Sequence, residues 1–230
     1  QNCNFLVPPS LCKYDPFGSF PVSSFLLKMF SEVELARDVV ICAKHLEGQP
    51  PHQRILEKLL RELMDERACK KHGFFLGITA VKSIGEGKKI NDNNNDDNHP
   101  GPVLRFPVSF MCRTFLPVRG EIMEGIVEKM FGTGVFIRKG PLRFAYLSSI
   151  KMPRYRYVPS EEGEEEKPYF LRDDLSKIAV GVVVRFEVLA VRFKLGQDWW
   201  RINEFFVLAS LAGNDTLGPV SLAGSEEPYM

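Results

Sequence analysis

The sequence predicts a small α+β domain followed by an all-β, five-stranded barrel of the OB type. Only the segment 51–69 has the three- and four-residue apolar spacing of a long amphipathic helix. From residue 120 onward, strand-length apolar runs are separated by glycine-containing turns. Five strands with glycine corners and a long insertion between the third and fourth are typical of an OB-type barrel. A small open sandwich is the alternative. The expected barrel strands lie at about 120–130, 134–139, 142–147, 178–193 and 200–211.

Composition and charge exclude several classes of protein. The 30 Lys and Arg residues nearly balance the 29 Asp and Glu residues, so any charged binding surface must be local. The five cysteines are odd in number and none are at metal-ligand spacing, which favours a reducing compartment without a disulfide framework or a metal site. No apolar run has the length of a membrane span. We therefore expect a soluble intracellular protein that contacts no membrane.

The first 28 residues differ from the rest of the chain. Residues 1–28 contain four prolines and little hydrophobic periodicity. They lack the basic start and sustained apolar core of a secretory signal. We interpret them as a disordered leader or a gene-model extension that precedes Met29. A targeting or docking extension is the alternative.

Residues 29–116 are predicted to form the α+β domain. Pro51 is suited to the first turn of the helix 51–69, and Gly73 is the expected C-terminal cap. Pro107 predicts that the last strand is bent or lies at an edge. A single helix covers one face of a sheet, so the other face suggests a partner. The expected strands are 30–42, 74–81 and 103–116.

Polar segments divide and end the predicted domains. The Asn- and Asp-rich stretch 91–102 reads as a disordered loop, and it lacks the glycine and distal glutamate of an EF-hand. Pro117 to Gly120 marks the boundary of the barrel domain, predicted at 117–212. Five glutamates make 161–166 a solvated insertion, and 213–230 is expected to be a flexible tail.

Aromatic and basic residues interleave in the first three predicted barrel strands. Phe136 and Arg138 share one side of their strand, opposite Val135 and Ile137. Such a surface stacks bases on rings and neutralises phosphates, which predicts weak, salt-dependent binding of single-stranded RNA. A packed barrel with ordinary surface lysines remains the alternative. The candidate RNA-binding residues are Lys129, Phe131, Phe136, Arg138, Lys139, Arg143, Phe144 and Tyr146.

The packing of two of these aromatic residues is left open by the sequence. Phe144 and Tyr146 share a side with Leu142 in a strand of regular alternation. Leu142 is a natural core residue, so at least one of the two rings is a candidate for the core.

No catalytic constellation is evident. Cys69 and His72 could be a nucleophile and a base, but residues three apart at a helix end meet through helix geometry alone. The sequence has no HExxH motif, and Gly85-Glu86-Gly87 lacks the GK[ST] of a phosphate-binding loop. We predict no catalytic residue, no metal and no cofactor. An enzyme of the Cys-His kind is a distant alternative.

Several strings resemble a known family. MFSEVELARDVVICAKHL, the helix with the run KKHGFFLGITAVKSIGEG, and PVRGE followed by VFIRKGP resemble the seventh-largest, or stalk, subunit of eukaryotic DNA-directed RNA polymerases. The resemblance covers about residues 29–211. The strings are most similar to the plant variants in RNA polymerases IV and V. The loops at 91–99 and 161–166 are longer than the family pattern.

The resemblance implies a function without catalysis. In that family the N-terminal domain is a tip that docks on the polymerase core, including the largest subunit, through a turn that corresponds to Ile84, Gly85, Glu86 and Gly87. The OB barrel faces emerging RNA, and the fourth-largest subunit binds across both domains. A place in the nucleus, in RNA-directed DNA methylation and gene silencing, follows for a polymerase IV or V subunit. The equivalent RNA polymerase II subunit and a free-standing RNA-binding regulator are alternatives.

Overall fold

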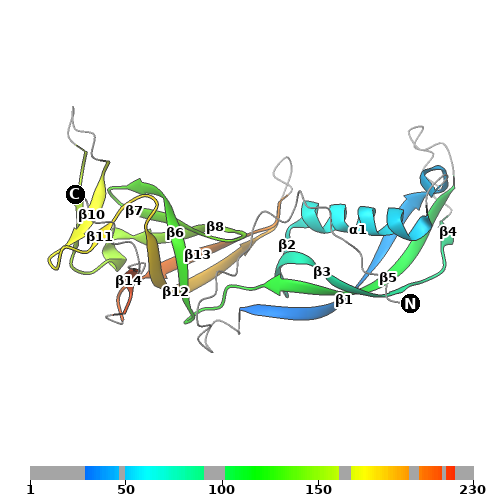
Figure 1. Ribbon diagram of the computed structural model, residues 1–230, viewed down its shortest axis with the longest axis horizontal. Coiled ribbons are helices and arrows are strands. Elements are labelled where there is room, and N and C mark those ends of the chain that lie inside the picture. The colour runs from blue at the N-terminus through cyan, green and yellow to red at the C-terminus, as the bar shows by residue number, and fades with distance from the viewer. Residues whose placement is uncertain are drawn as a thin grey trace, which may run out of the picture.

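The computed structural model is mostly β-structure with one α-helix (Figure 1). A helix-bearing sheet and a closed barrel lie side by side along the long axis of the molecule. The predicted leader, the core of the Asn/Asp loop, the acidic insertion and most of the predicted tail lie outside the described residues. The structure describes residues 29–46, 50–90, 102–160, 167–196, 202–213 and 216–220.

The first sheet is antiparallel and has the order β1-β5-β3-β2, with β4 also paired to β5. The helix α1, Pro51–Glu66, lies on one face (Figure 1), where Ile55, Leu59 and Leu63 pack in one core with Val39 and Phe110. The short 3-10 turn η1, Ala43–Leu46, follows β1. The strands are β1 (Phe30–Cys42), β2 (Ala68–Cys69), β3 (Gly73–Ile84), β4 (Lys88–Ile90) and β5 (Val103–Phe115).

The prediction that Pro107 places its strand at an edge of the sheet is wrong, whereas its alternative, a bent strand, stays a prediction. β5 lies between β1 and β3 in the centre of the sheet. In an antiparallel strand, the N–H and C=O of one residue face the same neighbour. The carbonyl of Pro107 accepts a hydrogen bond from the Gly85 N–H at 2.8 Å, just beyond the last β3 pairing at Ile84 and Val108. The nitrogen of Pro107 therefore faces the place where β3 ends, and no ladder bond is lost.

The helix ends earlier than predicted, and Gly73 does not cap it. α1 stops at Glu66 because Arg67 adopts a left-handed conformation with φ 63°. The Arg67 N–H closes the last turn on the Leu63 carbonyl at 2.8 Å. Ala68 and Cys69 then form β2, which pairs with Phe74 and Gly73 at the start of β3. Gly73, at φ +85°, is needed for a close approach, since a Cβ there would lie 2.2 Å from the Phe115 carbonyl oxygen.

The sheet face opposite α1 carries polar side chains together with the exposed Phe30 and Val40. Glu34 accepts a hydrogen bond from the Ser109 hydroxyl at 3.0 Å, and Glu32 accepts one from Thr79. Arg105 and Asp38 form a loose ion pair at 3.9 Å. These polar groups are paired within the sheet and exposed to solvent, and the expectation of a partner on this face stays a prediction.

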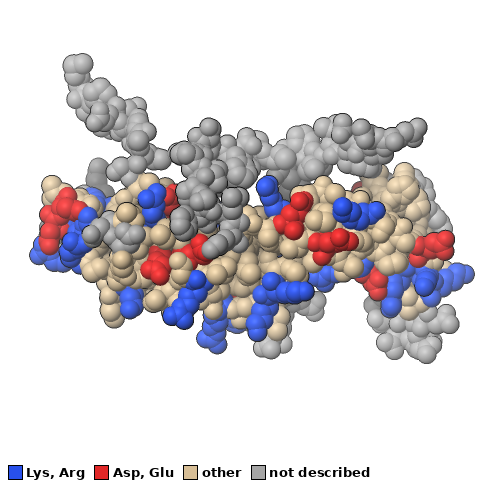
Figure 2. Space-filling view, turned by 90° about the horizontal axis from the view of Figure 1, so that it is seen from below, with Lys and Arg blue, Asp and Glu red and all other residues tan. Residues whose placement is uncertain are grey.

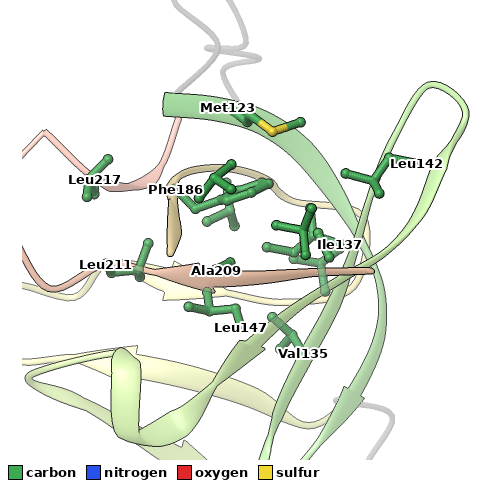
Figure 3. Close-up of a cluster of buried hydrophobic side chains, with 14 of the residues drawn as sticks. Met123, Val135, Ile137, Leu142, Leu147, Phe186, Ala209, Leu211 and Leu217 are labelled. Atoms are coloured by element: carbon green, nitrogen blue, oxygen red, sulfur yellow. The ribbon is translucent and has the colours of Figure 1, made fainter. Parts of the chain in front are cut away.

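The barrel is closed by five strands, as predicted. The pairing runs β12-β6-β7-β8-β13 and returns to β12; β8 and β13 are parallel, and the other pairs are antiparallel. Figure 3 shows Val135, Ile137, Leu147 and Phe186 among the side chains that fill the interior, and each is fully buried. The strands are β6 (Ile122–Phe131), β7 (Gly134–Lys139), β8 (Leu142–Ser148), β12 (Val183–Lys194) and β13 (Glu204–Ser210).

The fourth barrel strand begins later than predicted. Val180 is 46% exposed, and Gly181 turns the chain at φ +91° before β12 starts. The register then shifts between Val188 and Ala190, which interrupts the alternation of inward and outward side chains. Val184, Phe186 and Val188 face the core.

The insertion between the third and fourth barrel strands contains a small antiparallel sheet that the sequence pattern did not reveal. Its order is β11-β10-β9. Its short strands have no long alternation, so no periodicity signal arises. The elements are η2 (Ser149–Lys151), β9 (Tyr155–Val158), β10 (Tyr169–Arg172) and β11 (Lys177–Ile178); near the chain end, β14 (Gly218–Pro219) pairs with β12.

The helix-bearing sheet and the barrel share one hydrophobic core. Phe74 of β3 and Phe205 of β13 have ring centroids 5.3 Å apart, and both side chains are buried. Beside them, Arg67 forms a buried ion pair with Glu204 at 3.0 Å and donates to the Pro141 carbonyl at 2.5 Å. Asn203 donates to the Ala68 carbonyl at 2.8 Å. The position of the barrel relative to the sheet is therefore fixed by packing and by polar contacts.

Candidate nucleic-acid interface

None of the eight predicted RNA-binding side chains is buried in the barrel core. Each is exposed or half-buried, while their neighbours Val135, Ile137, Ala145 and Leu147 are fully buried. The alternation of β7 and β8 produces this division, because successive side chains point to opposite faces of a strand.

One group of aromatic rings crosses β6, β7 and β8. Phe136 pairs with Tyr146 across the strands, and their ring centroids are 5.1 Å apart. Phe131 meets Phe136 edge-on, with centroids 6.1 Å apart and an angle of 87° between the rings. The Tyr146 hydroxyl donates to the Thr133 carbonyl at 2.8 Å, which fixes its ring at the turn between β6 and β7. These rings form a continuous exterior surface.

A second aromatic pair extends the surface to β13, and sequence reasoning missed half of it. Phe144 stacks on Phe206 with centroids 5.0 Å apart and 14° between the rings. Both are 37% exposed, and the next outward residue on β13, Leu208, is 50% exposed. The doublet Phe205-Phe206 did signal that one ring faces outward, since neighbours on a strand face opposite sides. The parallel pairing with β8 has no local sequence signal.

The prediction that Leu142, Phe144 and Tyr146 point to the same side of their strand is wrong. Leu142 is fully buried, whereas Phe144 and Tyr146 face outward. The register between β7 and β8 shifts between Ile137 and Lys139, next to the turn that leads to Leu142. This irregularity turns Leu142 into the barrel, so neither aromatic ring is core.

The cations on this surface differ in their availability. Lys129 and Arg143 are exposed, and Lys129 lies opposite Phe136 in the register. Arg138 is engaged by the carboxylate of Glu128 from β6. In the view of Figure 2, basic side chains gather along one border of the barrel half, whereas acidic and basic side chains alternate over the helix-bearing half. Basic side chains are thus concentrated locally on the barrel in a chain of net charge +1.

Arg143 also lies near the buried pair between the sheet and the barrel. Burial raises the pKa of the Glu204 carboxyl, against the opposing effects of Arg67 and, more weakly, Arg143. Burial likewise lowers the pKa of Arg67, with Glu204 acting in the other direction and Arg143 adding to the lowering. Desolvation therefore outweighs the attraction within the pair.

The predicted docking turn, Ile84 to Gly87, connects β3 to β4 and packs on β5. A Cβ at Gly85 would lie 2.6 Å from Cγ of Pro107, and one at Gly87 would lie 2.6 Å from the ring of Phe106. Ile84 is half-buried against the core beneath α1. Glu86 and the backbone of Gly87 are the exposed parts of the turn.

The described residues offer no metal site, and their cysteines are not arranged as reactive thiols. They contain no group of three His, Cys, Asp or Glu side chains placed to hold a metal. Cys69 and His72 meet through the His72 backbone N–H, which donates to the sulfur at 3.3 Å. Burial raises the pKa of the Cys112 thiol, which disfavours the reactive thiolate. No described helix is long and apolar enough to cross a membrane.

The fold and this surface define a β-barrel protein that presents aromatic and basic side chains on its exterior. The chain is 63% identical to the DNA-directed RNA polymerase subunit 7-like protein of Arabidopsis thaliana, over 88% of this chain and all of the relative. It is 38% identical to DNA-directed RNA polymerase V subunit 7 and 35% identical to DNA-directed RNA polymerase IV subunit 7 of the same plant, covering 84% and 83% of this chain and 99% of each relative. No family model matches the chain.

The chain belongs to the subunit 7 family of DNA-directed RNA polymerases. The family resemblance inferred from the sequence strings is therefore confirmed.

Proposed function

We propose that this protein is a non-catalytic stalk subunit of a nuclear DNA-directed RNA polymerase, with an OB-fold barrel that contacts emerging RNA. Membership of the subunit 7 family is the observation that carries the proposal. The closed five-stranded barrel, with a long insertion between its third and fourth strands, supports the OB assignment. The polymerase is of the plant IV or V type, acting in RNA-directed DNA methylation and gene silencing, which the matches to those two subunits support.

The attachment of the subunit is proposed to involve two surfaces. The turn Ile84 to Gly87 enters the polymerase core, and its packing on Pro107 and Phe106 supports a preformed shape. A helical subunit of the fourth-largest type binds across sheet and barrel. Leu60 and Met64 on the outer side of α1, at 43% and 66% exposure, support an apolar contact there.

Purification of the tagged full chain from plant nuclei tests the proposal. We expect the largest subunit of RNA polymerase IV or V to co-purify, together with a fourth-subunit partner, and mass spectrometry to identify both. Recovery with the largest subunit of RNA polymerase II would assign the chain to that enzyme instead. Recovery without any large polymerase subunit would contradict the stalk assignment and favour a free-standing RNA-binding regulator.

The salt dependence of RNA binding tests the role of Lys129 and Arg143. Each phosphate neutralised on a single strand contributes about 0.7 to the slope of log K against log salt. Replacing both residues with alanine is expected to reduce that slope by about 1.4 and to weaken binding to all sequences equally. Fluorescence anisotropy with labelled oligouridylate at several salt concentrations measures both the slope and the affinity. Arg138→Ala is the comparison, with a smaller expected change because Glu128 already engages Arg138.

A further inference from the structure

A groove separate from the barrel lies between α1 and the adjoining ends of β1 and β5. It has a volume of about 390 Å³, which is within the range of sites that hold small ligands or several peptide side chains. Its floor is apolar, and its rim, formed by α1, carries three cations and the carboxylate of Glu57. The lining residues are Val40, Ile41, Cys42, His45, Arg54, Glu57, Lys58, Arg61 and Val103.

The basic rim arises from the sequence of the helix. Arg54, Lys58 and Arg61 are the only Arg or Lys residues of α1, and all three line the groove. Their spacing of four and then three residues places them in one stripe along the helix. The stripe extends for about 10 Å, since each residue of an α-helix advances the chain by 1.5 Å.

These cations are only partly compensated. Glu57 lies 3.4 Å from Arg54 and also accepts a hydrogen bond from Gln53, and Glu62 lies 3.7 Å from Lys58. Arg61 is exposed and forms no ion pair with the described residues. The Nε of Arg54 is buried and lacks an acceptor in the described chain. A buried donor without an acceptor is unfavourable, so an oxygen acceptor that reaches this Nε on a shift of the half-exposed Arg54 side chain would be stabilised there.

We propose that this groove binds an acidic peptide segment of a partner protein, with an apolar side chain on the floor and carboxylates on the rim. Cations spread along a helix match carboxylates spaced along a peptide better than they match one phosphate group. The apolar part of the lining, which includes Ile41 and Val103, accepts an aliphatic side chain. Among the described residues, no Phe, Tyr or Trp ring lines the groove and His45 is its one aromatic side chain, so nucleobases have little surface to stack on. The site is independent of RNA binding by the barrel.

Anisotropy measurements with the full chain and defined probes test the proposal. The probe is a fluorescein-labelled peptide of repeated Glu-Glu-Leu, and its Gln-Gln-Leu counterpart is the uncharged control. Lys58→Glu/Arg61→Glu is expected to weaken binding of the acidic peptide by about tenfold or more. Lys70→Glu/Lys71→Glu makes the same charge change at exposed positions outside the groove and is expected to change affinity by less than about twofold.

A charge-conserving variant distinguishes a specific hydrogen-bonding site from general attraction between opposite charges. Arg54→Lys keeps the positive charge but removes the Nε donor, and we expect binding of the acidic peptide to weaken by about threefold. Equal losses in the two charge-reversal variants would overturn the proposal, as would equal affinity for the two peptides. Binding of oligouridylate that is lost in Lys58→Glu/Arg61→Glu but kept in Lys70→Glu/Lys71→Glu would reassign the groove to nucleic acid. Thermal unfolding of each variant confirms that it is folded.

Discussion

Replacing Glu204 with leucine is expected to lower the free energy of unfolding by about 3 kcal/mol, because it leaves the Arg67 guanidinium buried without its counter-charge. The two side chains are only 15% and 9% exposed, and their ion pair joins the end of α1 to the start of β13. Arg67 also lies over the ring of Phe74, 5.6 Å from its centroid, within the core that sheet and barrel share. Urea unfolding followed by circular dichroism measures the loss.

The reverse replacement and the double replacement give the thermodynamic cycle for this pair. Arg67→Met is expected to cost about 2 kcal/mol, less than Glu204→Leu, since a carboxyl with a raised pKa can take up a proton. The double variant Arg67→Met/Glu204→Leu is expected to lie within about 1 kcal/mol of the parent chain, because it removes both desolvation costs. Additive losses in the double variant would contradict a coupled pair.

The same pair predicts a dependence of stability on pH. Burial holds the folded-state pKa of Glu204 above its ordinary value of 4.5, so the folded protein binds a proton there more readily than the unfolded chain. The resulting contribution to stability is present below pH 4.5 and is lost as the pH rises through the folded-state pKa. The double variant lacks this contribution. Its stability relative to the parent chain should therefore increase over that pH window.

An exposed pair supplies the control. Arg156 and Asp173 lie 3.1 Å apart, but their side chains are 82% and 72% exposed. Solvent screens such a pair, so Arg156→Ala should change the free energy of unfolding by less than about 0.5 kcal/mol. A loss in Arg156→Ala as large as in Glu204→Leu would show that burial does not decide the effect.

The helix-bearing sheet illustrates what sequence patterns can and cannot predict. The apolar stripe of α1 and the limits of β1 follow from local periodicity, because burial of one face imposes it. The central position of β5 does not follow from Pro107 alone. It depends on where β3 ends, which is a property of another strand. The left-handed Arg67 that stops α1 is likewise held by contacts with Glu204 and Pro141, far away in sequence.

In the candidate RNA surface, too, features within one strand were predictable from the sequence, whereas features set by a neighbouring strand were not. The outward rings of β6 and β7 follow from alternation within each strand. Phe206 was missed because its neighbour Phe144 reaches it only through the parallel pairing of β8 and β13. The irregular register near Lys139 reversed the expected side of Leu142. In each case the error arises where one strand's geometry is set by a partner that is distant in the chain.

The stack of Phe144 on Phe206 leads to the second large prediction. Stacking of a base on an aromatic side chain contributes about 1–3 kcal/mol of binding free energy. A loss of about 1.4 kcal/mol weakens the affinity tenfold. The variant Phe144→Ala/Phe206→Ala is therefore expected to bind labelled oligouridylate about 10- to 100-fold more weakly. Its salt slope should be unchanged, because neither ring carries charge. Anisotropy titrations at several salt concentrations measure affinity and slope together.

Matched variants separate stacking from general apolar contact. Leu175→Ala removes an apolar side chain that is 79% exposed on the β10–β11 turn, outside the barrel wall, and should leave RNA affinity unchanged. Phe144→Leu/Phe206→Leu keeps apolar area but removes both rings, and should bind nearly as weakly as the alanine pair. Full affinity in the leucine pair would exclude base stacking. Unchanged RNA binding in the alanine pair, with loss of the fourth-subunit partner in co-purification, would make this surface a protein interface instead.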